Sequence, residues 1–166
     1  HRSEKTGLDP RMIATWSVLA KYEAGRKPDP TARFERDKMD DLAIELRLIF
    51  NENNNTINRV ERTLADYGIK FCIVPKVNHA SIDGYSFFSN GVPSIVITKR
   101  YNRIDNMAFA VMHEVGHLKL HSSEDDEGKI NLPITDVEDI PSEEREANEY
   151  AANALIPEST WASLPS

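Results

Sequence analysis

The sequence predicts an α+β fold, with several helices around a small group of strands. On both sides of residues 69–98, apolar residues recur at three- and four-residue spacing among charged ones, as they do in amphipathic helices. Within residues 69–98 the apolar runs are short, rich in β-branched residues and separated by turn residues, as in strands. The 166 residues suffice for one domain whose core needs no disulfides.

The first predicted helix covers residues 10–24, because Asp9 can cap its start and the proline that follows fits the first turn. Its apolar side is formed by Met12, Ile13, Trp16, Leu19 and Ala20. Pro28-Asp29-Pro30 then breaks the helical pattern and predicts a short extended connector. We therefore divide the chain into residues 1–36, an N-terminal helix with its linker, and residues 37–166, the main domain.

Two further helices open the main domain. Apolar positions among charges predict a helix over residues 40–51, and Asn53-Asn54-Asn55 follows it as a turn. Thr56 is the predicted N-cap of the next helix, which runs through Ala65 and ends at Gly68. Both helices are interpreted as structural.

Three strands are predicted next, at residues 69–75, 81–88 and 93–98. Asn90-Gly91 lies between the second and third strands and favours a hairpin, so we expect a small antiparallel sheet. An exposed edge of this sheet could hold an extended peptide by backbone pairing, or the sheet could serve only as support. The sequence leaves both readings open.

The helix predicted over residues 106–121 contains the pattern H-E-x-x-H. At 3.6 residues per turn, His113 and His117 lie one turn apart on the same side, so their imidazoles can bind one metal ion. Glu114 lies beside the first ligand and could take a proton from a water that the metal activates. This division of roles is what a zinc hydrolase requires.

Gly116 strengthens this interpretation. A glycine inside a helix costs about 0.5 to 1 kcal/mol relative to alanine, so we expect backbone or substrate to approach closely there. The alternative is a solvated helix with two incidental histidines. Against it, the segment has a second, apolar side made of Ala108, Val111, Met112, Val115 and Leu118.

A catalytic zinc usually takes three protein ligands, so a third must come from elsewhere. A helix is predicted over residues 142–156, with Ser142 as N-cap and Pro157 as stop. The chain before it, around Glu124-Asp125-Asp126-Glu127, is polar and acidic and is interpreted as a solvated loop. The predicted helix offers four glutamates: Glu143, Glu144, Glu146 and Glu149.

Helical geometry favours Glu144 as the third ligand and leaves Glu146 as its main rival. Glu144 shares a face with the small and apolar residues Ala147, Ala151 and Leu155, which can pack against the H-E-x-x-H helix. A carboxylate at the start of that face would be carried inward, where a cation makes its burial tolerable. Asn148, one turn further on, could orient a ligand.

Composition excludes several other classes of protein. The net charge of −7 argues against direct nucleic-acid binding by this chain, because phosphate contact requires a basic surface. No apolar run approaches the roughly 20 residues that span a bilayer, and no hydrophobic signal region is seen. The single cysteine, Cys72, fits a reducing cytoplasm and lies in an apolar run, so we expect it to be buried. Because the first residue is His1, we expect the chain to be part of a longer protein.

These motifs resemble the ImmA/IrrE family of zincin-like metallopeptidases. The resemblance is carried by residues 113–118 (HEVGHL) and 144–152 (EREANEYAA), with Leu155-Ile156-Pro157 at the end. Residues 82–106 are also similar to the form of this domain found behind a helix-turn-helix in HigA-like antitoxin regulators. The similarity covers most of residues 37–157.

The resemblance implies a zincin-like fold of the gluzincin type. It implies Zn²⁺ bound by His113, His117 and a glutamate of the second helix, with Glu114 as general base. We expect a zinc metallo-endopeptidase domain that cuts a protein or peptide partner, for example a repressor or a toxin. The alternative is a non-enzymatic sensor domain of an antitoxin-type regulator, whose DNA-binding part would lie outside this chain.

The sequence does not identify the residue that would stabilise a developing oxyanion. His121, Tyr150 and His79 are candidates by residue type alone, because each can donate a hydrogen bond.

Overall fold

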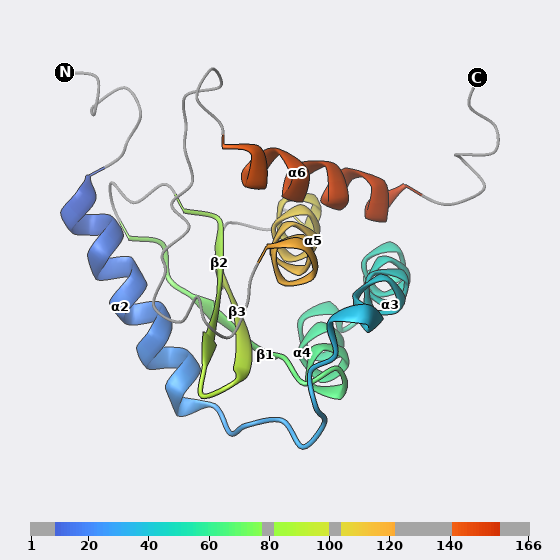
Figure 1. The fold of residues 1–166 in the computed structure, drawn as a ribbon, viewed down its shortest axis with the longest axis horizontal. Coiled ribbons are helices and arrows are strands. Elements are labelled where there is room, and N and C mark those ends of the chain that lie inside the picture. Colours follow the sequence, from blue (N-terminus) through green and yellow to red (C-terminus); the bar gives the residue numbers. More distant parts are fainter. Residues whose placement is uncertain (1–8, 78–81, 100–103, 122–140, 157–166) are drawn as a thin grey trace.

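The computed structural model describes residues 9–77, 82–99, 104–121 and 141–156, and it confirms the α+β class. Over these residues the chain forms helices around one small sheet (Figure 1). The elements, in chain order, are α2 (Pro10–Arg26), the 3-10 turn η1 (Arg36–Lys38), α3 (Met39–Glu52), α4 (Thr56–Asp66), β1 (Lys70–Val74), β2 (Gly84–Ser89), β3 (Val92–Thr98), α5 (Ile104–Leu120) and α6 (Ser142–Leu155).

The sheet has the strand order β1-β3-β2 and is mixed. β2 and β3 form the predicted hairpin, and Asn90 and Gly91 at its turn have φ of 52° and 78°. β1 pairs with β3 in parallel, so the prediction of an antiparallel sheet is wrong for this pair. The reason is that β3, buried along nearly its whole length, takes the central place, while β2 reverses the chain direction before β3 begins.

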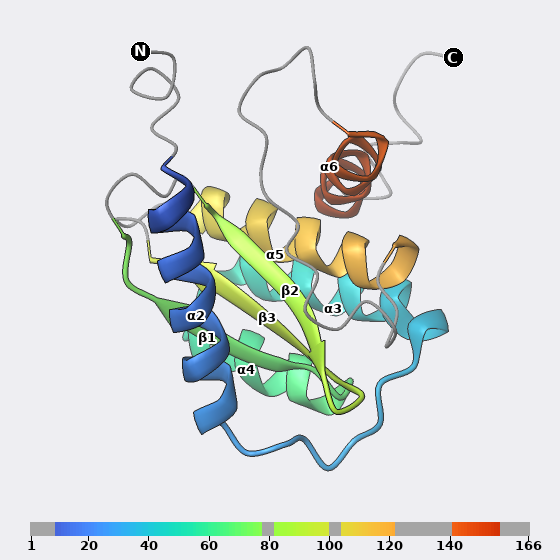
Figure 2. The same cartoon turned by 60° about the vertical axis from the view of Figure 1, so that its left-hand side comes forward.

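Helices cover both faces of the sheet (Figures 1 and 2). α3, α4 and α5 lie on one face, where Leu46, Leu64 and Met112 belong to a core that includes residues of all three strands. α2 lies on the other face, where Trp16 is 1% exposed and meets Tyr85 of β2 edge to face at 6.0 Å between ring centroids. The helix predicted for the N-terminal segment is thus packed on the sheet, and a domain boundary after residue 36 stays a prediction.

Two of the predicted helix-end residues are confirmed, and two predicted N-caps are wrong. Asp9 caps α2 by accepting a hydrogen bond from the Arg11 amide at 2.9 Å, and Gly68 follows α4 with φ of 79°. Thr56 and Ser142 are first residues of their helices, so their prediction as N-caps is wrong by one position. Thr56 Oγ1 instead donates to Asn53 Oδ1 at 2.8 Å, which ties the α3–α4 turn together.

The burial of Cys72 and the length of the helices were also predicted from the sequence. Cys72 is free and buried, as predicted, and burial raises the pKa of its thiol. Within the described ranges, every helix is too short or too polar to cross a lipid bilayer. His79, the acidic stretch at residues 124–127 and Pro157 lie outside the described residues.

Candidate metal centre

α5 and the residue that follows it present three histidines in a row on one side, His113, His117 and His121, spaced by one helical turn each. The ring centroids of His113 and His117 are 4.8 Å apart, and those of His117 and His121 are 5.3 Å apart. The opposite side of α5 is held in the core by Val111, Met112, Val115 and Leu118, all fully buried. Because the core fixes the rotation of α5, the histidine row faces α6.

Glu144 of α6 reaches the first two histidines of this row. Its Oε2 lies 2.9 Å from His113 Nε2, and its Oε1 lies 2.9 Å from His117 Nε2. The two Nε2 atoms are 3.2 Å apart. The structure therefore brings together the three residues that the sequence analysis selected as metal ligands.

The three side chains fit a divalent metal ion. They are the one described group of histidine, cysteine and acidic residues that offers converging ligand atoms, all within 4.8 Å of one another. Two imidazole nitrogens and a carboxylate oxygen form a donor set that zinc accepts in hydrolytic enzymes. Burial alone would raise the pKa of Glu144, but hydrogen bonds with His113 and His117 outweigh it and lower the pKa to about 2.

Glu146, the rival ligand, is directed elsewhere. Its Oε2 lies 2.5 Å from Nε2 of His121, and its side chain is 55% exposed. Asn148 instead lies on the His113 side. Burial lowers the pKa of His113, but hydrogen bonds with Glu144 and Asn148 and the charge of Glu114 raise it overall. This placement agrees with the predicted position of Asn148 beside a ligand.

Glu114 lies between α5 and β2 and is only 5% exposed. β2 makes room for it, because a Cβ added at Gly84 would lie 3.3 Å from Glu114 Oε2. Burial raises the pKa of Glu114, while His113, His117 and Ser86 act in the opposite direction. A carboxyl group with a raised pKa next to two candidate metal ligands is suited to accept and return a proton.

At Gly116 the close neighbour is the side chain of Tyr150 on α6, whereas the sequence predicted backbone or substrate there. A Cβ added at Gly116 would lie 3.1 to 3.2 Å from the Cβ, Cγ and Cδ1 atoms of Tyr150. Tyr150 in turn donates a hydrogen bond to Asp40 Oδ1 at 2.9 Å and packs under Lys119, whose Nζ lies 2.8 Å from Asp40 Oδ2. These contacts join α3, α5 and α6 beside the candidate metal centre.

Valine in place of Gly116 is therefore expected to destabilise the protein by about 1–3 kcal/mol, because Tyr150 must move and take α6 with it. Gly25 provides a matched control, since it lies in α2 and a Cβ there meets nothing within 4 Å. Gly25→Ala should leave stability unchanged or raise it slightly. Chemical denaturation of the parent, the Gly116→Val protein and the Gly25→Ala protein measures the difference. Equal midpoints would show that the contact with Tyr150 leaves room for a larger side chain at Gly116.

Two oxyanion candidates are engaged in other contacts. The single O–H of Tyr150 has two acceptors within reach, Asp40 Oδ1 at 2.9 Å and the Met39 carbonyl at 3.2 Å, and His121 pairs with Glu146. No sequence pattern predicted the cluster of Asp40, Lys119 and Tyr150, because its members are far apart in the chain. Lys119 holds the pKa of Asp40 below its usual value.

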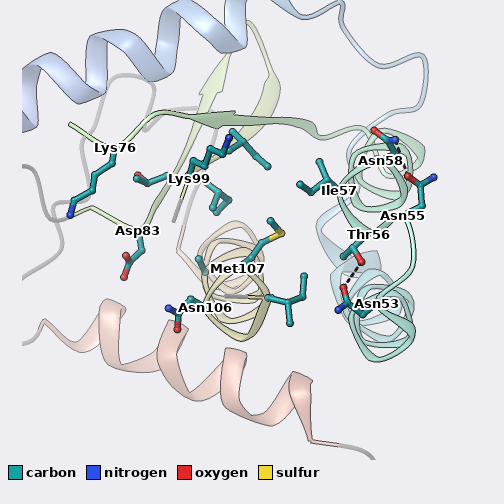
Figure 3. Close-up of a pocket in the computed structure, with 15 residues that line it drawn as sticks. Asn53, Asn55, Thr56, Ile57, Asn58, Lys76, Asp83, Lys99, Asn106 and Met107 are labelled. Atoms are coloured by element: carbon teal, nitrogen blue, oxygen red, sulfur yellow. Dashed lines mark hydrogen bonds between the residues drawn. The ribbon is translucent and has the colours of Figure 1, made fainter. Parts of the chain in front are cut away.

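A second concave surface lies apart from the histidine row. This open groove is lined by residues from the α3–α4 turn, the strands and the start of α5, among them Asn55, Lys76, Lys99 and Met107 (Figure 3). His113, His117 and Glu144 are not among its lining residues. The groove is therefore not the candidate metal centre.

Converging histidine and glutamate side chains in an α+β domain are the arrangement expected of a metallopeptidase-like protein. The chain matches the Peptidase_M78 family model, described as the IrrE N-terminal-like domain, over residues 64–164. This match spans more than half of the chain, so the protein belongs to that family, and the ImmA/IrrE resemblance is confirmed. Comparison with curated proteins and with solved structures gave no match.

Proposed function

We propose that this chain is a zinc-dependent metallo-endopeptidase domain of the gluzincin type, which hydrolyses a peptide bond in a protein partner. The observation that carries the proposal is the convergence of His113, His117 and Glu144, with Glu114 beside them. Membership of a peptidase family supports it. A transcriptional regulator, such as a repressor, or a toxin is the proposed kind of partner, from the resemblance of residues 82–106 to antitoxin regulators.

The four residues have two roles in the proposed mechanism, metal binding and proton transfer. His113, His117 and Glu144 hold the metal. A bound zinc ion supplies a Lewis acid that polarises the scissile carbonyl and lowers the pKa of water toward about 7. Glu114 takes the proton of the attacking water and delivers it to the departing amine.

β2 is the proposed docking strand for the substrate. It is an outer strand of the described sheet, and its Gly84 lies against Glu114. An extended peptide that paired with β2 would run past the side of α5 that carries the histidines. This arrangement favours an unfolded segment of a protein over a small molecule as substrate.

One observation favours a second function, that of a non-enzymatic sensor or interaction domain of an antitoxin-type regulator. Tyr150 and His121 are both occupied by other partners, so neither is free to stabilise an oxyanion among the described residues. In this second function the bound metal would stabilise the fold, or the domain would respond to the metal concentration.

Metal analysis tests the site that both functions share. Glu144→Ala is expected to weaken zinc binding by about a hundredfold or more, because a direct ligand should matter at least as much as a supporting residue does. Glu146→Ala should still bind one equivalent when zinc is in excess. Equal zinc affinity in the parent and Glu144→Ala would show that Glu144 is not a ligand.

A cleavage assay then separates the two functions. The parent protein, loaded with zinc, is incubated with reduced and alkylated casein and with a mixture of peptides from a digested proteome, and new termini are identified by mass spectrometry. Zinc-dependent cleavage that a chelator abolishes supports the peptidase. Stoichiometric zinc without any new termini supports the sensor.

A further inference from the structure

His117 is connected through His121 to Glu146 by two successive contacts. His117 Nδ1 lies 3.3 Å from His121 Nδ1, and His121 Nε2 lies 2.5 Å from Glu146 Oε2. These atoms lie on the side of His117 opposite its Nε2, which faces Glu144. His117 therefore belongs to the proposed metal site through Nε2 and contacts His121 through Nδ1.

The proton positions along this connection follow from the proposed function. A histidine that binds metal through Nε2 carries its proton on Nδ1, so His117 can only donate from that atom. His121 Nδ1 must then accept this hydrogen bond and be unprotonated, which places the proton of the His121 ring on Nε2. That proton points to a carboxylate, Glu146, which can only accept. One assignment of tautomers thus satisfies both contacts.

The neighbouring histidine, His113, differs from His117 at the corresponding ring atom, Nδ1. His113 Nδ1 is buried and has no hydrogen-bond partner among the described residues. The two histidines therefore differ, although they occupy equivalent positions one turn apart on α5. Among the described residues, His117 is therefore the one of the two whose Nδ1 has a partner, and that partner is His121, one helical turn further on.

The fold explains why two glutamates only two positions apart reach different histidines. α6 lies across α5 (Figures 1 and 2), so side chains on different sides of α6 meet successive turns of α5. Glu144 reaches His113 and His117, and Glu146 reaches His121. An exposed polar contact contributes little to stability, and the Glu146 side chain is 55% exposed. We therefore interpret this contact as one that orients the imidazole of His121, which is 8% exposed.

We propose that His121 and Glu146 are positioning residues for the metal, because they fix the tautomer and the ring orientation of His117. This inference rests on the proposed function, since it requires His117 to bind metal through Nε2. Groups that orient a metal-binding histidine typically change metal affinity by about 10–100-fold when they are removed. His121 and Glu146 touch neither metal nor substrate.

The test is zinc affinity, measured by competition with a chromophoric chelator. His121→Leu, which keeps the bulk but cannot accept a hydrogen bond, is expected to weaken binding by about 10–100-fold. His121→Asn should recover part of the affinity, because Asn Oδ1 takes the place of His Nδ1 as acceptor. Glu146→Ala should weaken binding by about tenfold, and Glu146→Gln, which keeps an acceptor oxygen, by less.

Glu149→Gln is the matched control, because it removes one negative charge from an exposed position of the same helix. Its zinc affinity should equal that of the parent. If Glu149→Gln weakens zinc as much as Glu146→Ala does, the effect is one of net charge and the inference is overturned. Circular dichroism of the metal-free variants confirms that each is folded.

A direct reading of the proton positions does not depend on any variant. In the zinc-loaded parent, labelled with ¹⁵N at histidine, nuclear magnetic resonance should show His121 with its proton on Nε2 and none on Nδ1. The opposite tautomer overturns the inference even if His121→Leu fails to fold.

The two proposals fail in different ways. If the parent binds no zinc through His113, His117 and Glu144, the proposed function falls. If the parent binds zinc and cleaves peptides, but His121→Leu binds zinc as tightly as the parent, only the role of His121 and Glu146 is overturned.

Discussion

Glutamine in place of Glu114 is expected to slow peptide cleavage by about 10²–10⁴-fold, the usual contribution of a positioned general base. Zinc should remain bound at one equivalent, because Glu114 is not among the three converging ligands. The measurement is the cleavage rate of any peptide that the parent cuts, together with the zinc content of both proteins.

The control for this variant is Asp105→Asn, which removes an acidic charge from the exposed first turn of the same helix. It should cleave at the parental rate. A Glu114→Gln protein that kept zinc and cleaved as fast as the parent would show that another group is the base. Loss of zinc in Glu114→Gln would instead point to a misplaced helix, since the carboxyl is packed against β2.

Alanine in place of Trp16 is expected to destabilise the protein by about 3–5 kcal/mol, because it empties space between α2 and the sheet. Trp16 is 1% exposed and packs edge to face on Tyr85 of β2. For a chain of this size the loss corresponds to a fall in Tm of roughly 6–20 °C. Differential scanning calorimetry of the two proteins measures it.

Val18 lies on the opposite side of the same helix and is 69% exposed, so Val18→Ala should leave Tm within a degree or two. The pair of variants also tests the predicted boundary between residues 1–36 and residues 37–166. If Trp16→Ala leaves the main transition unchanged, the first helix is a separate segment. A single transition at lower temperature means that α2 belongs to the cooperative domain.

Helical periodicity accounts for what the sequence predicted well. His113 and His117 share a side of α5 because they are four residues apart, and the apolar residues Val111, Met112, Val115 and Leu118 define which side is buried. Gly116 indicated a close approach, and Tyr150 makes it. The same reasoning favoured Glu144, because Ala147, one turn further along α6, lies on its buried side and is 0% exposed.

Contacts between distant segments could not be predicted in the same way. The parallel pairing of β1 with β3 depends on which strand takes the centre of the sheet, and no local pattern states this. The Asp40, Lys119 and Tyr150 cluster joins residues that lie up to 110 positions apart. The contact of His121 with Glu146 could not be predicted either, because Glu146 lies on another helix.

The sequence by itself determined the α+β class, the pair of imidazoles and the adjacent carboxylate, because local spacing fixes which side chains share a helix face. Only the tertiary structure decided which glutamate meets which histidine and in which direction the first strand runs. The physical reason is that the crossing of α6 over α5 depends on packing at Gly116 and Tyr150, where two segments far apart in the chain come into contact.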